Sequence, residues 1–486
     1  MFTGIDIGGT NTDIAIVDRE IQTFKLPNTA GLPAALALAG TKGRLAVSTS
    51  QPLNSVVTSS EYKIRTITIP GPGLVHGGAI KGAVSHRGEV LEPVDKDEVR
   101  HLIRGFHADA VAIVGKFSVR NPELEEGVRK IAQEFFDDHQ IAVSYPLGGL
   151  NFPARITTTQ VNARIKGTVS SLARIIRQTH PDFLFVTSDG GLTSSERAIE
   201  NPSLLFHSSP ATVALGAQYL SGKKDCLVVD IGGTTTDLVP IKNGKPILDT
   251  LYLNGKKTLI NTLSTITIPF GGDSCIREDC YKSQLCQFRS GNSRAFGGGE
   301  PTLTDALNIL GAGIGDTIRS QTLEQNRAEF SVMTYLERVS EEIRRQNPSY
   351  IVGTGFLAEY LIPDLADASR VPWTIPEHAA SANAVGAAVS RISIQVHVHS
   401  DSEKKIFTLN GKHYPHPGNL SDDKLITHAG ILIREITRGQ GAPEEDLHQI
   451  VTSRFTGFNV VRAGRTAGRI VDFVAGIAPG ITAEAP

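Results

Sequence analysis

One short turn sequence occurs twice in this chain and constrains its fold more than any other feature. The first copy is GIDIGGTNTDIAIVD, residues 4–18, and the second is LVVDIGGTTTDLVPIKNG, residues 227–244. In each copy an apolar run ends in aspartate, Gly-Gly-Thr follows, and apolar alternation resumes after a second aspartate. This pattern predicts a β-hairpin with glycines at its bend and a third strand after it. Two copies far apart in the chain therefore predict two halves that each supply one hairpin.

The tip of such a hairpin is suited to binding phosphate. Glycine lets the backbone approach an anion closely because it has no Cβ atom, and backbone N–H groups and threonine hydroxyls can donate to phosphate oxygens. Two hairpins across a cleft can clamp a triphosphate from both sides, whereas ligand-free glycine hairpins leave the duplication unexplained. We therefore expect phosphate contacts from Gly8, Gly9, Thr10, Asn11 and Thr12 and from Gly232, Gly233, Thr234, Thr235 and Thr236.

Aspartates flank each glycine bend. Mg²⁺ binds proteins through few carboxylates and keeps several of its waters, so these acids suit a hydrated ion beside the phosphates. We assign Asp6 and Asp230 to the metal and Asp13 and Asp237 to catalysis. The expected cofactors are therefore ATP and Mg²⁺.

A third glycine cluster lies in the stretch YIVGTGFLAEYLIPDL, residues 350–365. Its pattern predicts a buried strand, a glycine turn and a helix, an arrangement that suits adenosine or phosphate at the helix start. Many α/β turns share this pattern, but its position after the second hairpin favours adenosine. Gly353 and Gly355 therefore join the expected nucleotide site.

Length and patterning predict an α/β protein of several domains. A chain of 486 residues is too long for one hydrophobic core, and predicted strands and helices alternate through most of it. We expect residues 1–205 to hold the first hairpin and an inserted α/β region, and residues 206–391 the second hairpin and the adenosine turn. From about Ile392 the pattern changes to hairpins and one short helix, which predicts a small α+β subdomain over residues 392–486.

Composition argues against several classes of partner. The formal net charge is −2, which favours neither nucleic acid nor an anionic membrane surface. No apolar run is long enough to span a bilayer, and strand-like residues begin at Phe2, which leaves no room for a signal peptide. Four cysteines do not make a disulfide framework in a chain of this size. We expect a cytoplasmic protein without a membrane segment.

The two hairpins and the glycine turn resemble the ATPase superfamily of actin, heat-shock-70 proteins and sugar kinases. That resemblance implies two duplicated ribonuclease-H-like sheets. A narrower set of motifs resembles the A-type subunit of the ATP-dependent hydantoinase and oxoprolinase family, which includes acetone carboxylase β-like subunits. These motifs are RGEVLEPVDKDEVRHL, FSVRNPELEEGVRKIAQE, TTTQVNARI, LFVTSDGGLTSSERAIENP, HSSPATVALGAQYL, GGGEPTLTDALNILG and ASANAVGAA.

The family resemblance implies a reaction as well as a fold. Such subunits use ATP to phosphorylate the carbonyl oxygen of a cyclic amide, an imide or a ketone. A B-type partner subunit then hydrolyses or carboxylates the activated species. By this resemblance we expect a small lactam, imide or ketone substrate and a B-type partner, with a homo-oligomer left open.

Four further polar residues are candidates for the same cleft. Asp189 follows a predicted buried strand and is a third catalytic candidate, because a carboxylate at a strand end can accept a substrate proton, or bind and polarise the substrate. An Asp-Gly turn explains it equally well. Asp305 lies at a predicted helix start, where an acid is favourable by itself, and the family pattern places it near the nucleotide. Asn162 and Arg164 either line the cleft or lie on a solvated helix face.

Cysteines and histidines cluster without a recognisable metal-binding spacing. Cys275, Cys280 and Cys286 form no CxxC pair, and partly exposed loop thiols explain them better than a metal site. His397 and His399 lie on one face of a predicted strand, and His413 and His416 follow in a turn, which would also suit a metal ion. We interpret these histidines as surface residues of a hairpin.

Two rival functions remain open. A kinase for a sugar or another small alcohol would use the same fold with a catalytic base and a stable phosphorylated product. A non-catalytic ATP switch, such as an actin-like filament protein or a regulator, would hydrolyse ATP slowly without small-molecule stimulation. We see no DNA-binding motif or basic patch, which disfavours a regulator.

Overall fold

The computed structural model describes residues 1–58, 61–74, 76–279, 282–289, 291–448 and 450–486. The first hairpin belongs to a six-stranded sheet with the order β11-β10-β4-β1-β2-β3. Strands β1, β2 and β3 pair antiparallel in sequence order, and β4 and β10 continue the sheet parallel to β1. The bounds are β1 Phe2–Ile7, β2 Asn11–Val17, β3 Ile21–Pro27, β4 Arg44–Thr49, β10 Leu184–Val186 and β11 Leu192–Ser194.

The second hairpin lies in a sheet with the order β14-β13-β12-β20-β21, to which β17 adds beside β13. Here too an antiparallel hairpin is extended by a strand parallel to its first arm, because β20 pairs parallel with β12. The bounds are β12 Cys226–Ile231, β13 Thr236–Lys242, β14 Lys245–Pro246, β17 Ile266–Ile268, β20 Ile351–Thr354 and β21 Trp373–Thr374. The predicted duplication, with a strand after each hairpin, is confirmed.

Two helices pack closely where the two sheets meet. Helix α7 (Ser208–Ser221) crosses α12 (Ala382–Val389), and α12 also lies against β1 and β2. At the crossing, a Cβ atom on Gly216 would lie 1.8 Å from the Ala382 carbonyl oxygen, and one on Gly386 would lie 1.8 Å from the Thr212 carbonyl oxygen. Only glycine permits so close an approach, so this crossing fixes how the halves, and their hairpins, face each other.

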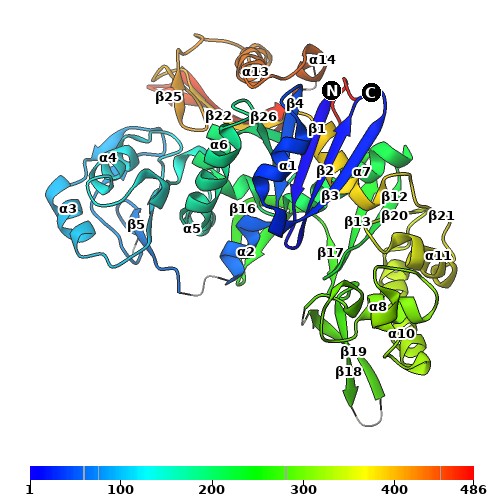
Figure 1. Cartoon of the computed structure of the whole chain (residues 1–486). Coiled ribbons are helices and arrows are strands. Elements are labelled where there is room, and N and C mark those ends of the chain that lie inside the picture. The colour runs from blue at the N-terminus through cyan, green and yellow to red at the C-terminus, as the bar shows by residue number, and fades with distance from the viewer. Residues whose placement is uncertain (59–60, 75, 280–281, 290, 449) are drawn as a thin grey trace.

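An inserted α/β region separates β4 from β10 and forms the cyan lobe in Figure 1. Its parallel three-stranded sheet has the order β5-β8-β9, and its helices bury apolar faces against that sheet. The long helix α5 then returns the chain to β10. The bounds of this region are α2 Gln51–Thr58, β5 Ile64–Ile69, β6 Ala83–Val84, β7 Val90–Glu92, α3 Lys96–Arg104, β8 Ala110–Gly115, α4 Glu123–Ala132, β9 Ile141–Val143 and α5 Phe152–Arg177. Helix α1 (Leu32–Ala39) precedes β4, and α6 (Ser195–Glu200) follows β11.

A second insertion lies between β13 and β20. The expectation that these cysteines are partly exposed loop thiols is wrong for Cys275 and Cys286. Both lie in paired strands, and they are 2% and 8% exposed. Ile276 and Leu285 of the same strands join the hydrophobic core, which buries this hairpin. Cys280 lies outside the described residues. The bounds of this insertion are β15 Leu248–Leu253, β16 Lys256–Leu263, β18 Ser274–Asp279, β19 Lys282–Arg289, α8 Leu303–Ile309, α9 Thr317–Ser320 and α10 Gln325–Gln346. Helix α11 (Ala358–Ser369) follows β20.

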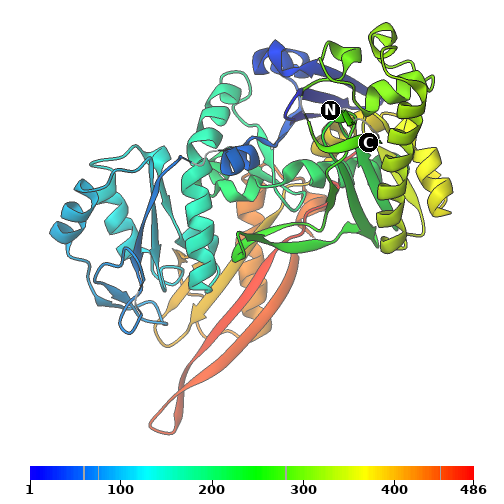
Figure 2. The ribbon, with the colours of Figure 1, turned by 90° about the horizontal axis from the view of Figure 1, so that it is seen from below.

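The C-terminal residues form an antiparallel sheet with the order β24-β23-β22-β26-β25, covered by a helix. Strands β25 and β26 extend beyond it as the long ribbon seen in Figure 2. Among the described residues, no helix is long and apolar enough to cross a membrane. The bounds are β22 Ile394–Asp401, β23 Ile406–Leu409, β24 Lys412–Tyr414, α13 Asp422–Arg438, α14 Glu444–Leu447, β25 Ile450–Arg462 and β26 Arg465–Ile477.

The histidines of this sheet are only partly at the surface. His397 and His399 lie two residues apart on β22 and therefore share a face, as predicted. The expectation of surface residues is wrong for His399, which is 2% exposed and whose Nδ1 lies 2.9 Å from Asp472 Oδ1 on the neighbouring strand. His413 is exposed.

Candidate functional site

The tips of the two hairpins line one cavity of about 770 Å³. Thr10, Asn11 and Asp13 come from the first hairpin, and Asp230, Gly232 and Gly233 come from the second. Gly355, in the turn after β20, lines the same cavity together with Phe356, Leu357 and Tyr360 of the adjoining segment. The volume lies within the range of about 300–1,000 Å³ that small-molecule and cofactor sites occupy. Two separate sequence motifs and a third glycine turn thus meet at one hollow.

Two further cavities continue from this hollow. One of about 210 Å³ is lined by Asp6, Gly8, Gly9, Asp230 and Asp237, and shares Asp230 and Asn383 with the first. The next, of about 610 Å³, is lined by Gly9, Thr234, Thr235 and Asp237 and by part of the β15–β16 hairpin. The hairpins therefore lie between a hollow on the Gly355 side and another on the β15–β16 side.

The two bends have the same local geometry. The Gly8 N–H donates to the Asn11 carbonyl at 3.0 Å, and the Gly232 N–H donates to the Thr235 carbonyl at 3.0 Å. In both hairpins the two aspartates are directly opposed across the antiparallel strands, Asp6 with Asp13 and Asp230 with Asp237. The spacing of glycines and acids along the sequence therefore brings two carboxyl groups together on each hairpin.

In the first hairpin both carboxylates are buried and held by neighbouring side chains. Ser209 Oγ donates to Asp6 at 2.8 Å, and the Asn383 side-chain amide donates to Asp6 at 2.8 Å and to Asp13 at 3.1 Å. Lys25 Nζ lies 2.6 Å from Asp13 Oδ1. Burial, chiefly, raises the pKa of Asp6, and the charge of Asp13 adds to that shift. Neither Asn383 nor Lys25 was among the residues predicted from sequence.

In the second hairpin the carboxylates have fewer compensating partners. Thr354 Oγ1 donates to Asp230 at 2.8 Å, and Thr267 Oγ1 donates to Asp237 at 2.6 Å. Burial and the nearby charge of Asp237 raise the pKa of Asp230 from 3.8 to about 7, and burial raises the pKa of Asp237. Such a site suits a cation, because a positive charge would relieve the repulsion between these acids.

The acids fit a hydrated ion better than a directly ligated one. Within the described part of the chain, no group of three or more His, Cys, Asp or Glu side chains is arranged to hold a metal ion. Asp6, Asp230 and Asp237 nevertheless line the same small cavity. Mg²⁺ usually keeps several waters and needs only one or two carboxylates, so this donor set is compatible with water-mediated binding.

Replacing Asp230 by asparagine is expected to stabilise the folded chain at about pH 8. Between about pH 4 and pH 7 the Asp230 carboxyl is protonated in the folded state but ionised in the unfolded state. The stability that this protonation contributes is therefore complete below pH 4 and is lost as the pH rises to 7. The expected gain from Asp230→Asn near pH 8 is on the order of 4 kcal/mol. Urea denaturation of both proteins across this pH range measures it, and an unchanged pH dependence would contradict the raised pKa.

Arg289 bridges the two sides of the large cavity. Its Nη1 donates to Thr10 Oγ1 at 2.7 Å on the first hairpin, and its Nε lies 3.1 Å from Asp273 Oδ2. The backbone of Asp273 in turn donates to the Gly233 carbonyl of the second hairpin at 2.6 Å. This guanidinium therefore lies between the two hairpins, on the wall of the large cavity. No sequence signal marked it, because its partners are far away along the chain.

Several predicted site residues have structural contacts instead of lining the cavities described above. Thr12 Oγ1 donates to Asn28 Oδ1, and Thr236 Oγ1 donates to the Phe270 carbonyl. Gly353 lies within β20, where a Cβ atom would approach Ile362 at 2.5 Å. Asp305 is fully buried and forms a capping box with Thr302 at the start of α8.

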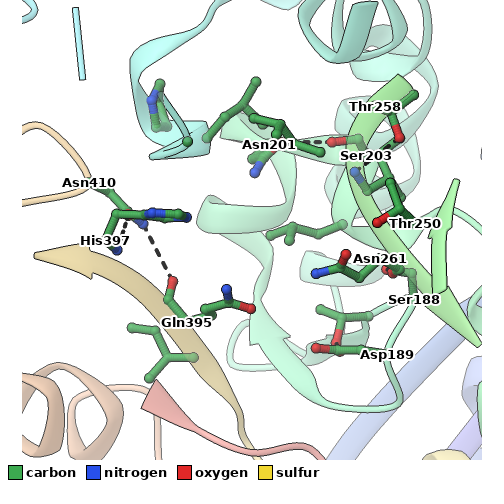
Figure 3. A pocket seen from close by; sticks show the side chains of 18 of the residues that line it. Ser188, Asp189, Asn201, Ser203, Thr250, Thr258, Asn261, Gln395, His397 and Asn410 are labelled. Carbon is green, nitrogen blue, oxygen red and sulfur yellow. Dashed lines mark hydrogen bonds between the residues drawn. The ribbon is translucent and has the colours of Figure 1, made fainter. Parts of the chain in front are cut away.

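Asp189 and the two α5 candidates lie elsewhere. Asp189 lines a separate cavity of about 370 Å³, shown in Figure 3, that the predicted hairpin residues do not line. Asn162 is buried and accepts from the Ser203 N–H at 2.7 Å. Arg164 Nη2 donates to the Tyr62 carbonyl at 3.0 Å. The predicted cleft therefore comprises the hairpins and the Gly355 turn, without these three residues.

Two family models match this chain. The model for the hydantoinase/oxoprolinase N-terminal region matches residues 75–136, and the model for hydantoinase/oxoprolinase matches residues 155–316. The first falls in the inserted α/β region, and the second runs from α5 through the second hairpin to the loop after α8.

Two curated proteins match about half of the chain. The acetophenone carboxylase gamma subunit of Aromatoleum aromaticum is 25% identical over 286 residues, which is 51% of this chain and 38% of that protein. An uncharacterised protein of Methanocaldococcus jannaschii is 22% identical over 298 residues, which is 54% of this chain and 44% of that protein. The matched region therefore spans about two fifths of the length of these curated relatives.

Two solved structures share the fold over nearly the whole chain. A nucleotide-free acetone carboxylase structure matches with a TM-score of 0.70 and 16% identity, covering 99% of this chain and 87% of that chain. An ATP-dependent caprolactamase from Pseudomonas jessenii matches with a TM-score of 0.68 and 18% identity, covering 100% and 88%. The predicted α/β fold with duplicated actin-like ATPase domains is confirmed. Residues 75–136 and 155–316 are thus similar to hydantoinase/oxoprolinase domains, and the chain as a whole shares the fold of these two solved structures.

Proposed function

We propose that this chain uses ATP to phosphorylate the carbonyl oxygen of a cyclic amide or a ketone. The observation that carries the proposal is the convergence of both glycine hairpins and the Gly355 turn on one cavity. The names of the similar proteins, acetone carboxylase, acetophenone carboxylase and ATP-dependent caprolactamase, support a ketone or a lactam as the substrate class.

The nucleotide would span the large cavity. Its adenosine would lie against the Gly355 turn, where Phe356 and Tyr360 supply aromatic surface. Its phosphates would reach the hairpin tips, where Thr10, Asn11 and the Gly232–Gly233 backbone provide donors. Arg289 would exchange its contact with Thr10 for a phosphate oxygen, since a guanidinium pairs well with phosphate.

The acceptor would bind on the other side of the hairpins. The hollow lined by Thr234, Thr235 and Asp237 lies next to the small acidic cavity and is closed by the β15–β16 hairpin. From there the carbonyl oxygen would attack the γ-phosphorus in line. The bond from that phosphorus to the bridging oxygen breaks, and ADP leaves with the electron pair.

Asp6, Asp230 and Asp237 are the residues that would hold Mg²⁺ through water, as the small cavity allows. When bound there, the ion would neutralise phosphate charge. Asn383 would keep the Asp6 and Asp13 carboxylates oriented by donating to both, and Lys25 would pair with Asp13.

The phosphorylated product needs a second reaction. An O-phosphorylated amide is a far better electrophile than the amide, and attack by water opens the ring, whereas an activated ketone can be carboxylated. We assign that step to a separate B-type subunit, because the acetophenone carboxylase relative is named as one subunit of a larger enzyme.

A coupled assay of ADP release tests the proposal. The chain, with and without the product of a neighbouring reading frame, is given hydantoin, 5-oxoproline, caprolactam, acetone, acetophenone and a set of sugars. We expect a lactam or a ketone to raise ADP release above the basal rate. Stimulation by a sugar alone would instead identify a small-molecule kinase, and ATP hydrolysis that no compound changes would identify an ATP switch.

A further inference from the structure

A second polar cavity, of about 370 Å³, lies apart from the nucleotide hollow and is lined by several separate parts of the chain. Figure 3 shows Thr250, Thr258 and Asn261 of the β15–β16 hairpin on one side and Gln395, His397 and Asn410 of the C-terminal sheet on the other. The segment after β10, with Ser188 and Asp189, also lines it. Its volume is enough for a small metabolite.

Arg197 gives this cavity a buried donor that has no acceptor. Its Nη2 donates to the Gln395 carbonyl at 3.2 Å, but its Nη1 is buried and has no hydrogen-bond partner among the described residues. The hydroxyl of Thr193, which also lines the cavity, is likewise buried without a partner in the described structure. Such groups are costly to leave unsatisfied, which points to a missing acceptor inside the cavity.

Two more cations line the same space. Lys257 on β16 and Arg454 on β25 form no ion pair or side-chain hydrogen bond with any described residue. Arg454 lies in a β-bulge between Ser453 and Thr456, with a left-handed backbone at φ 52°. Bulges commonly redirect a side chain toward a site, and a non-glycine residue in this conformation stores strain.

The neighbouring acids of the described structure offset only part of this charge, because Asp189 and Glu200 interact electrostatically with Arg197 alone of the three cations. Asp189 is the acid of the lining, and its Oδ1 already accepts from Thr187 Oγ1 at 2.6 Å and from the Gly191 N–H at 3.3 Å. Burial, together with the charges of Arg454 and Arg120, lowers the pKa of His397 to about 4, so its ring is neutral at pH 7. Three cations and one carboxylate, that of Asp189, therefore line the cavity, which leaves an excess of positive charge.

We propose that this cavity binds a small organic carboxylate, with its charge held by Arg197, Lys257 and Arg454. A guanidinium fork matches the two oxygens of a carboxylate. Leu147, Leu259 and Ile394 supply apolar wall for a carbon skeleton, and the amides of Asn261 and Gln395 can meet a second polar group. The cavity shares Thr250 with the hollow assigned above to the acceptor, but its ligand requires no nucleotide.

Isothermal titration calorimetry of the full chain tests this proposal. The probes are acetate, butyrate, glutarate and glutamate, with glutaramide as the neutral counterpart of glutarate and inorganic phosphate as an anion without a carbon skeleton. We expect at least one carboxylate to bind, glutaramide to bind far more weakly, and phosphate to compete poorly. Lys257→Gln should weaken carboxylate binding roughly tenfold and Arg197→Gln by up to about a hundredfold, as for lost charge-assisted hydrogen bonds.

Lys256→Gln is the matched control. Lys256 is the neighbour of Lys257 on β16 and does not line the cavity, because alternate strand residues face opposite sides. It should bind carboxylates as the unchanged chain does, and none of the variants should alter nucleotide affinity. The proposal is overturned if no carboxylate binds, if glutaramide or phosphate binds as well as glutarate, or if Lys256→Gln and Lys257→Gln behave alike.

Discussion

Replacing Asp237 by alanine is expected to reduce ATP turnover by about a hundredfold to a thousandfold, the range seen when a group that stabilises a transition state is lost. The carboxyl of Asp237 lines both the small acidic cavity and the proposed acceptor hollow. Its removal would leave the phosphates and the attacking oxygen without the charge that organises them. Asp13→Ala should have a comparable effect, because Asp13 is its counterpart on the first hairpin. Steady-state ADP release measures both.

The loss should not arise from unfolding. Burial raises the pKa of Asp237, so its ionised form costs the folded state stability and the alanine variant should melt no earlier than the unchanged chain. Asp18→Ala is the control, since Asp18 follows the far end of β2 and its side chain is 63% exposed. Wild-type turnover in Asp237→Ala, or equal loss in Asp18→Ala, would remove the hairpins from catalysis.

The sequence was sufficient for the hairpins because their chemistry is local. Gly8 and Asn11, or Gly232 and Thr235, lie three residues apart and define each bend by one backbone hydrogen bond. Strand alternation then opposes the two aspartates on each hairpin. Repetition of the motif indicated that both bends serve one site, and their shared cavity agrees with that expectation.

Residues brought in from distant parts of the chain could not be predicted in this way. Asn383 on α12 donates to both Asp6 and Asp13, and Arg289 on β19 reaches Thr10. No local pattern reports contacts of such long sequence separation. The carboxylate cavity escaped prediction for the same reason, since Arg197 on α6, Lys257 on β16 and Arg454 on β25 meet only through tertiary packing.

For some residues the local sequence pattern predicted a different environment from the one in the structure. Asp305 and Gly353 have the residue types of a ligand site, but Asp305 caps a helix and Gly353 makes room for Ile362. Cysteines in a polar stretch suggested an exposed loop, whereas Cys275 and Cys286 are buried because the β18–β19 hairpin packs into the core. Burial depends on what lies opposite a segment, which a single sequence does not specify.

The relative position of the two hairpins depends on the crossing of α7 and α12, so replacing Gly216 by alanine is expected to be unusually damaging. The added methyl group would lie 1.8 Å from the Ala382 carbonyl oxygen, which is backbone and cannot rotate away. The helices must separate along their contact, and α12 also packs on β1 of the first hairpin. We expect a loss of at least about 4 kcal/mol, in the range of exceptional substitutions. Urea denaturation measures it.

Gly127→Ala provides the matched comparison, because Gly127 lies within α4 and a Cβ atom there would meet nothing within 4 Å. The same chemical change should stabilise that helix by about 1 kcal/mol, through propensity alone. If Gly216→Ala folds with a weakened crossing, its nucleotide affinity should fall as well, since the hairpins would no longer face each other at the same separation. Equal stability of the two variants would show that the crossing tolerates a methyl group and does not set the width of the cleft.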